Sequence, residues 1–273
     1  MMRKSIEQPP QFDLKHFRSA LKTDVLGRVL HYFETIGSTN THLKEMLSQN
    51  SAEIPHGTIA LTDFQSTGRG RLGRQWSAPP RTALLVSLLI RPQFSPAWLP
   101  MIAGLAAVGT LESTTASLKW PNDVMLADQD GQWRKVAGIL VELQTDPDGS
   151  ITAIVGMGLN VNLAADQLPP AATPATSLRV ALGEPVSREL LLARWLKRLE
   201  DWLISAENGH SPQPAWNKCL ITLNQPVTVR GALTIDGIAE STDEWGRLLV
   251  RDAAGRLHAC AAGDVTLRGS QAA

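Results

Sequence analysis

The sequence predicts an α+β fold that ends in a small β-barrel. Helix-like and strand-like segments are mixed along the chain, and successive strands are joined by short Asp-Gly turns, which is typical of antiparallel pairing. From residue 226 onward, short β-rich runs alternate with glycine turns, a spacing that indicates a small barrel. We therefore expect a larger domain over residues 1–225 and a barrel domain over residues 226–273. A chain of 273 residues can hold both, because a domain takes roughly 100–200 residues.

The first expected elements are a short helix and then a strand within residues 12–34, where apolar side chains recur. A turn of sequence GSTN follows at 37–40, and its hydroxyl groups can cap a helix that runs through Leu47. Residues 58–64 are strand-like. The next stretch, GRGRLGRQW at 68–76, has the period of neither a helix nor a strand, so we expect a loop.

The middle of the chain is predicted to alternate between buried elements and turns. We expect a buried strand at 84–90 and a helix at 100–111, which can begin at its proline. Residues 118–162 predict three strands, because the turns DQDG and DPDG separate apolar runs. Proline, alanine and threonine dominate residues 163–177, which predicts a mobile loop. Ser187 is expected to cap a long amphipathic helix.

The composition excludes several classes of protein. Lys and Arg total 26, as do Asp and Glu, so the formal net charge is zero and a globally basic nucleic-acid binder is not indicated. Two cysteines, Cys219 and Cys260, are too few for a disulfide framework or a thiol-rich metal site. There is neither a signal-peptide pattern nor an apolar run of the ~20 residues that cross a bilayer. We therefore expect a cytoplasmic protein without membrane contact.

The neutral total conceals one strongly basic segment. From Phe64 to Leu111 there is no Asp or Glu, but there are five arginines, so this segment carries +5 and the remainder −5. Three of the arginines alternate with the glycines of GRGRLGR. Glycine lets several backbone N–H groups converge on one anion, and each guanidinium matches a carboxylate or phosphate with two parallel donors. The segment therefore predicts an anion-binding loop; the plain alternative is a solvated basic turn.

The spacing also matches the dinucleotide fingerprint G-x-G-x-x-G, but the context does not. That motif opens a helix and is followed about 20 residues later by an acidic side chain. Here the loop continues into Trp76-Ser77-Ala78-Pro79-Pro80, and the next acidic residue is Glu112. A phosphate-binding loop of the G-x-x-x-x-G-K-[ST] type is also absent from the sequence.

Five motifs together carry a family resemblance. They are GSTN at 37–40, Gln65 with GRGRLGRQW, KWPND at 119–123, KVAGILVE at 135–142 and GMGLNVN at 156–162. In this order and at these separations, over roughly residues 27–268, the chain resembles bacterial biotin protein ligases. The resemblance implies a class II synthetase-like domain of the biotin/lipoate ligase type. Its central mixed or antiparallel sheet is flanked by helices, and a C-terminal barrel follows.

The resemblance also implies a reaction. Such ligases join biotin to ATP to form biotinyl-5'-adenylate, with Mg²⁺ as the accompanying metal, and pass biotin to a lysine of the biotin carboxyl carrier protein of acetyl-CoA carboxylase. A homodimer is a further possibility. Only 36 residues precede Gly37. We therefore expect no N-terminal DNA-binding domain, and hence a ligase that does not bind nucleic acid.

The resemblance implies a role for each matching residue. The catalytic residues would be Arg69, Arg71 and Lys135. Biotin would contact Ser38, Thr39, Asn40, Gln65, Arg69, Gly70, Arg71, Lys135 and Gly138. ATP or the adenylate would contact Gly68, Arg74, Trp76, Lys119, Asn122 and Asn160, with Asp123 as the magnesium ligand.

The residue types suit these roles on physical grounds. A urea-type ring needs both donors and acceptors, which hydroxyl and amide groups supply. A carboxylate that approaches a phosphate is repelled by about 4 kcal/mol at 4 Å and an effective dielectric of 20, so fixed cations are needed. Plainer interpretations remain open, namely helix capping at 38–40, a buried Trp76, a solvated Lys135 and a turn at Asp123.

Two residues depart from the family pattern, and several alternative functions remain open. Ala83 and Leu85 stand where the family often has an Asn and an aromatic residue, so one wall of the pocket is expected to differ. The nearest rival is a lipoate or octanoate ligase of related fold. The others are a nucleic-acid-binding protein that uses the arginine loop and a non-catalytic module that binds the carrier.

Overall fold

The computed structural model describes residues 9–50, 53–146, 148–170, 173–231 and 233–267. Within these residues, a first sheet has the strand order β1-β2-β3-β7-β6-β5-β4. Its strands are β1 (Leu30–Phe33), β2 (Ile59–Thr62), β3 (Ala83–Ile90), β4 (Ala116–Lys119), β5 (Asp123–Ala127), β6 (Trp133–Thr145) and β7 (Ile151–Asn160). The β1–β2 pair is parallel and the other neighbours are antiparallel, so the sheet is mixed, as expected.

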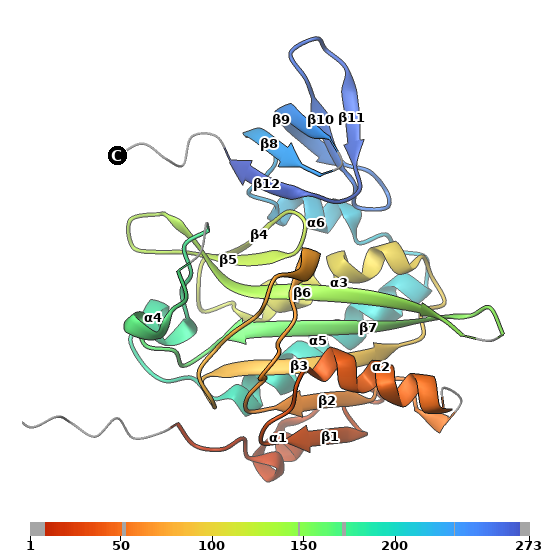
Figure 1. Cartoon of the computed structure of the whole chain (residues 1–273), viewed down its shortest axis with the longest axis vertical. Coiled ribbons are helices and arrows are strands. Elements are labelled where there is room, and N and C mark those ends of the chain that lie inside the picture. Colours follow the sequence, from red (N-terminus) through yellow and green to blue (C-terminus); the bar gives the residue numbers. More distant parts are fainter. Residues whose placement is uncertain (1–8, 51–52, 147, 171–172, 232, 268–273) are drawn as a thin grey trace, which may run out of the picture.

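A second, antiparallel sheet follows, in the strand order β11-β10-β9-β8-β12. Its strands are β8 (Pro226–Arg230), β9 (Thr234–Thr242), β10 (Leu248–Arg251), β11 (Leu257–Cys260) and β12 (Asp264–Leu267). The helices are α1 (Leu14–Ala20), α2 (Thr39–Asn50), α3 (Leu99–Thr110), α4 (Leu178–Leu182), α5 (Arg188–Glu207) and α6 (Gln213–Cys219). Figure 1 shows the second sheet beyond β4 and α6, at the top of the view. The expected α+β architecture with an all-β end is confirmed; the proposed boundary at residue 225 stays a prediction.

The two faces of the first sheet are covered unequally. Helices α3 and α5 cover one face, where they form the main hydrophobic core (Figure 1). On the other face, Leu43 and Leu47 of α2 pack against Leu89 and Ile154 at one end of β3 and β7. All of β3 is buried because both of its faces are covered. The rest of the second face remains available for a cavity.

A register shift in β6 determines which side chains face that cavity. Met125 of β5 pairs with Lys135, but the preceding residue, Val124, already pairs with Ala137, so Val136 is an extra residue in the strand. Val136 and Ala137 are both fully buried in the core. Side chains normally alternate between faces, so two successive core residues place Lys135 and the residue after Ala137 on the cavity side.

Most predicted elements are present, with differences at the turns. The single strand expected around KWPNDVML is two strands, β4 and β5, because the chain reverses at the cis peptide Trp120-Pro121. The segment 163–177, expected to be an irregular loop, contains a 3₁₀ turn at Ala165–Gln167. Strand β9 and the helices α4 and α6 were not predicted from the sequence.

Some predicted features lie outside the described residues. These are Pro147 in the DPDG turn, residues 171–172 of the proline-rich loop and Arg268 at the end of the region that resembles the family. Within the part of the chain that the structure describes, no helix is both long and apolar enough to span a bilayer.

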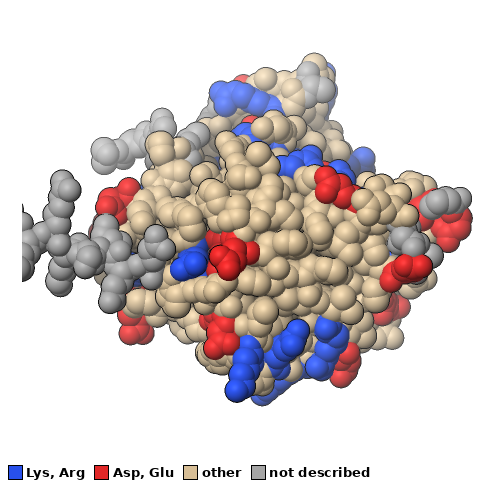
Figure 2. All heavy atoms as spheres, turned by 60° about the horizontal axis from the view of Figure 1, so that its bottom comes forward, with Lys and Arg blue, Asp and Glu red and all other residues tan. Residues whose placement is uncertain are grey.

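Charged side chains on one face of the molecule are dispersed. Figure 2 shows a broad uncharged area, with Lys and Arg gathered near its lower edge beside Asp and Glu. On this face the basic groups lie in separate clusters, several of them beside acidic groups.

A buried ion pair joins helix α5 to the end of β2. The Arg188 guanidinium lies 2.6 Å from Asp63 Oδ1, and these side chains are only 5% and 2% exposed. Tyr32 donates a hydrogen bond to the other carboxylate oxygen at 2.7 Å, and burial together with this bond raises the pKa of Tyr32 to about 12. The backbone of Asp63 also accepts a hydrogen bond from Arg81 N–H. Asp63 therefore links helix α5 to Arg81, which follows the segment that carries the arginine loop.

We expect Arg188→Met to lower the free energy of unfolding by about 3–5 kcal/mol, because the buried Asp63 carboxylate would lose its close cation and keep only Arg81 Nε, 3.9 Å away. Urea denaturation followed by circular dichroism measures this change. The control is Arg194→Met on the same helix, where the side chain is exposed and the expected change is within about 0.5 kcal/mol. Equal losses in the two variants would contradict this role of the pair.

Candidate active site

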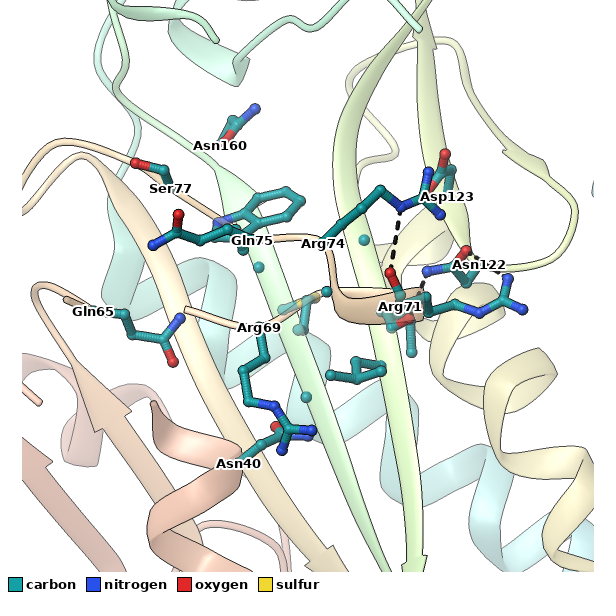
Figure 3. A pocket seen from close by; sticks show the side chains of 18 of the residues that line it. Asn40, Gln65, Arg69, Arg71, Arg74, Gln75, Ser77, Asn122, Asp123 and Asn160 are labelled. Carbon is teal, nitrogen blue, oxygen red and sulfur yellow. Dashed lines mark hydrogen bonds between the residues drawn. The ribbon is translucent and has the colours of Figure 1, made fainter. Parts of the chain in front are cut away.

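A cavity of about 470 Å³ lies over the open face of the first sheet. Strands β3, β7 and β6 form its floor, and most of the arginine loop (residues 68–76) together with Pro169, Pro170, Thr173 and Ala175 forms its rim. Figure 3 shows Arg69 directed toward Asn40 on one side, whereas Arg71, Arg74 and Asn122 gather on the other side. The cavity therefore has two ends that differ in their chemistry.

Most of the residues singled out in the sequence line this one cavity. They are Ser38, Thr39, Asn40, Gln65, Arg69, Gly70, Arg71, Arg74, Trp76, Asn122, Asp123, Lys135, Gly138 and Asn160. Gly68 and Lys119 lie just behind the lining. The carbonyl of Gly68 accepts a hydrogen bond from the Trp76 N–H, and Lys119 donates one to Thr173, which does line the cavity. Segments from five distant parts of the chain thus converge.

The first end of the cavity is polar and largely uncharged. Ser38, Thr39 and Asn40 are all buried at the start of α2. The Thr39 N–H donates to Gln65 Oε1 at 2.8 Å, which fixes the orientation of that amide. Ser87 of β3 lies in the cavity wall, and its hydroxyl oxygen is 2.7 Å from Thr39 Oγ1 and 2.5 Å from Asn40 Oδ1. Capping is weak here, since Thr41 N is 3.5 Å from Ser38 Oγ.

Glu142, at the end of the KVAGILVE motif, joins this polar end to the cations. Its carboxylate accepts hydrogen bonds from Asn40 Nδ2 at 2.9 Å, from Lys44 Nζ at 2.7 Å and from Arg69 Nη1 at 3.2 Å. Burial favours the neutral acid, but the hydrogen bonds from Lys44 and Asn40 and the nearby charges outweigh it and lower the pKa of Glu142. Sequence reasoning missed Ser87 and Glu142. A single acidic residue in an otherwise apolar strand was the available signal for Glu142.

Arg71 forms part of the cationic end. Burial lowers the pKa of its guanidinium. Its Nη1 donates to Asn122 Oδ1 at 3.3 Å, while the amide nitrogen of Asn122 donates to the Ile139 carbonyl at 2.8 Å. Arg74 instead reaches across to Asp264 in β12, at 2.7 Å, and is mostly exposed. Both arginines line the cavity, and Arg71 is the less exposed of the two.

Lys135 and Asp123 form an ion pair at 2.6 Å on the cavity wall. The plain expectation of a solvated lysine is wrong, because the extra residue in β6 directs Lys135 into the cavity. Lys119 lies nearby, and burial lowers the pKa of its ammonium while the charge of Asp123 opposes that change. Two lysines thus adjoin a single carboxylate.

Trp76 lies flat against the floor of the cavity. A Cβ atom on Gly158 would be 2.5 Å from the Trp76 ring, and one on Gly138 would be 3.3 Å away. The ring also packs with the buried cluster that contains Ala83 and Leu85. The indole N–H is buried and has no hydrogen-bond partner among the described residues. The two departures from the family pattern therefore lie in the cluster packed with Trp76 and are not among the lining residues of the cavity.

Comparison with known proteins gives consistent matches. The model of the biotin/lipoate A/B protein ligase family matches residues 32–162. The chain is 33% identical over 271 residues to the biotin–[acetyl-CoA-carboxylase] ligase of Mycobacterium tuberculosis, which covers 94% of this chain and 96% of that protein. It is 31% identical over 258 residues to a bifunctional ligase/repressor of Bacillus spizizenii, covering 90% and 76% of the two chains.

One solved structure shares both fold and sequence. It is the biotin protein ligase of Aquifex aeolicus in complex with biotin and ATP, with a TM-score of 0.72 and 29% identity. The match covers 88% of this chain and 99% of that one.

We expect Gly158→Ala to displace Trp76 and open the arginine loop, because overpacking costs about 1–3 kcal/mol, or at least fivefold in an opening equilibrium. Limited trypsin digestion followed by mass spectrometry measures cleavage within residues 68–76. Gly138→Ala, on the residue paired with Gly158, is the matched control and should accelerate cleavage much less, since its Cβ has more room. Similar cleavage rates in the two variants would show that Trp76 does not anchor the loop.

Proposed function

Because the chain belongs to the biotin/lipoate A/B protein ligase family, we propose that it is a biotin protein ligase. It activates biotin with ATP to biotinyl-5'-adenylate and transfers biotin to a lysine of a biotin carboxyl carrier protein. The single observation that carries this proposal is the two-ended cavity. A neutral end rich in hydrogen-bonding groups is joined to a cationic end that contains Arg71 and Lys135.

The neutral end supports biotin in preference to lipoate or octanoate. Thr39, Gln65 and Ser87 present hydroxyl and amide groups to the cavity, and a urea-type ring has both N–H donors and a carbonyl acceptor to satisfy them. A ligand that brings only a dithiolane ring or an alkyl chain would form no hydrogen bond with the free positions of these groups and would exclude water from them, which costs binding free energy. A lipoate ligase of related fold therefore remains the second candidate.

The cationic end supports the adenylation step. An oxygen of the biotin carboxylate attacks the α-phosphate of ATP, a new O–P bond forms, and pyrophosphate leaves with the electrons of the broken P–O bond. The two reactants are both anionic, so their approach is opposed by about 4 kcal/mol at 4 Å and an effective dielectric of 20. We assign Arg71 and Lys135 to offset this repulsion, most strongly in the transition state. Arg69 and the backbone of Gly70 would complete the carboxylate contacts.

The nucleotide has its own set of residues in this proposal. Gly68, Arg74, Trp76, Lys119, Asn122 and Asn160 would contact ATP or the adenylate. The indole N–H of Trp76 is buried and has no hydrogen-bond partner among the described residues. A buried donor without a partner costs free energy, which supports a ligand beside this group.

Magnesium would accompany ATP, with Asp123 as its protein ligand. Among the described residues, no three acidic, histidine or cysteine side chains are arranged so that they could hold a metal ion. A single carboxylate is nevertheless compatible, because Mg²⁺ takes most of its other ligands from phosphates and water. When bound, the metal would neutralise phosphate charge. Lys135 would then have to share or release Asp123.

In the second step the carrier lysine attacks the acyl carbon of the adenylate, an amide bond forms, and AMP leaves. Because the reaction consumes ATP, we place the protein in the cytoplasm. A homodimer, and the absence of nucleic-acid binding, remain predictions of this proposal.

We expect biotin to drive exchange of labelled pyrophosphate into ATP, since adenylate formation is reversible and needs no carrier. Incorporation of label with biotin, and its absence with lipoate or octanoate, is the expected result. Exchange that depends on lipoate or octanoate but not on biotin would instead select the second candidate.

We expect Arg71→Ala to slow single-turnover adenylation by about 100–1000-fold, or roughly 3 kcal/mol, as when one donor to a developing anion is lost. Arg71→Lys is the matched control, because it keeps the charge but loses the planar fork, and its loss should be smaller. Rapid-quench measurement of adenylate determines both. A wild-type rate for the alanine variant would remove Arg71 from the chemistry.

A further inference from the structure

Glu142 lies at one end of a chain of polar side chains that crosses the neutral end of the cavity. It accepts from Asn40 Nδ2, Asn40 Oδ1 contacts Ser87, Ser87 contacts Thr39, and Thr39 contacts Gln65 Oε1. All of the links are between 2.5 and 3.1 Å. The cavity-lining groups, and not Glu142 itself, would touch biotin.

The number of protons determines the direction of this chain. Ser87 and Thr39 have one hydroxyl proton each, but together they make three contacts with oxygen atoms. Asn40 Oδ1 can only accept, so the Ser87 proton points to Asn40. With its proton on Asn40, Ser87 cannot also donate to Thr39, so the Thr39 proton goes either to Ser87 Oγ or to Gln65 Oε1. In both cases the two lone pairs of Thr39 Oγ1 are left free.

Without Glu142, hydrogen bonds that run in the opposite direction, from Asn40 to Gln65, would satisfy these side chains equally well. If the Asn40 amide were flipped, its nitrogen would donate to Ser87, Ser87 to Thr39, and Thr39 to Gln65. One lone pair of Thr39 would then be occupied. The flip would, however, place Asn40 Oδ1 against the Glu142 carboxylate, where two acceptors repel.

Asn40 packs against β7 at a position that needs glycine. A Cβ atom on Gly156 would be 2.2 Å from Asn40 Oδ1. For the amide in this position, an ionised Glu142 favours the orientation that directs Nδ2 toward its carboxylate. Its Lys44 and Arg69 partners favour the ionised form.

We propose that Glu142 is a positioning residue that sets the hydrogen-bond direction through Asn40 and Ser87, and thereby keeps Thr39 Oγ1 free to accept a ring N–H of biotin. This inference rests on the proposed biotin ligase function and deepens it. It makes a residue that does not line the cavity a determinant of ligand affinity. A competing explanation is that Glu142 only neutralises Lys44 and Arg69, in which case Ser87 would be irrelevant to its effect.

A double-mutant cycle between positions 142 and 87 separates these explanations, because the two side chains communicate only through Asn40 in the proposed chain. Biotin affinity is measured by isothermal titration calorimetry for the wild type, Glu142→Gln, Ser87→Ala and the double variant. We expect each single variant to weaken biotin binding about 5–10-fold, in line with one lost hydrogen bond. The double variant should be no weaker than the weaker single variant. The matched control is Glu45→Gln, which removes an exposed charge from α2 and should stay within about twofold.

If the two single losses multiply to about 25–100-fold in the double variant, the proposal is overturned and the charge explanation is favoured. Wild-type affinity in Glu142→Gln would also overturn the proposal. A second variant guards against misfolding of Glu142→Gln. Asn40→Asp combined with Glu142→Gln moves the carboxylate to position 40, where it can only accept from Ser87, while the new amide at position 142 donates to it.

We expect this combined variant to recover biotin affinity relative to Asn40→Asp alone, which opposes two carboxylates. A folded combined variant without such recovery would also overturn the proposal, with folding checked by thermal unfolding. Failure of the wild-type protein to bind biotin at all would remove the proposed function itself. Biotin binding by the wild type with independent effects at positions 142 and 87 would remove only this inference.

Discussion

The structure depends on pairing cations that would otherwise repel one another in a single cavity. Each of three cations is held by a carboxylate from another strand: Arg69 by Glu142, Lys135 by Asp123, and Arg74 by Asp264. The arginine loop itself contains no acidic residue, so the partners of Arg69 and Arg74 come from β6 and β12. These pairs let the positive site persist in the folded protein without a bound anion. An incoming carboxylate or phosphate would exchange with the carboxylate of the protein.

The sheet brings these groups together because its two faces have different roles. One face is committed to the core under α3 and α5, and the other is only partly covered by α2. The extra residue in β6 allows Val136 and Ala137 to face the core together while Lys135 faces the cavity. Asp63 links helix α5 to Arg81, which follows the loop segment. A loop of glycine and arginine thus gains a defined position from elements that are themselves rigidly packed.

The two ends of the cavity express two kinds of selectivity. At the cationic end, Arg71 and Lys135 supply charge, which distinguishes anions from neutral molecules but does little to distinguish one acid from another. At the neutral end, selectivity depends on the direction in which each hydroxyl and amide points, since a buried donor facing a donor is unfavourable. Glu142 belongs to the neutral end, where it contacts Asn40 and the cation of Arg69 at once. At this end, a charged pair and the direction of the hydrogen bonds are therefore coupled through one residue.

The sequence by itself determined the elements and the identity of most lining residues. Apolar periodicity located β3, β7, α3 and α5, and the local glycine-arginine alternation located the loop, because both signals arise from neighbouring residues. Only the tertiary structure decided the partners. Ser87 in a buried strand carries no local mark of function, and the register that places it against Thr39 and Asn40 is a long-range property. The register shift at Val136 and the contact of Arg74 with Asp264 likewise depend on how separate segments pack, a property that no local pattern in the chain encodes.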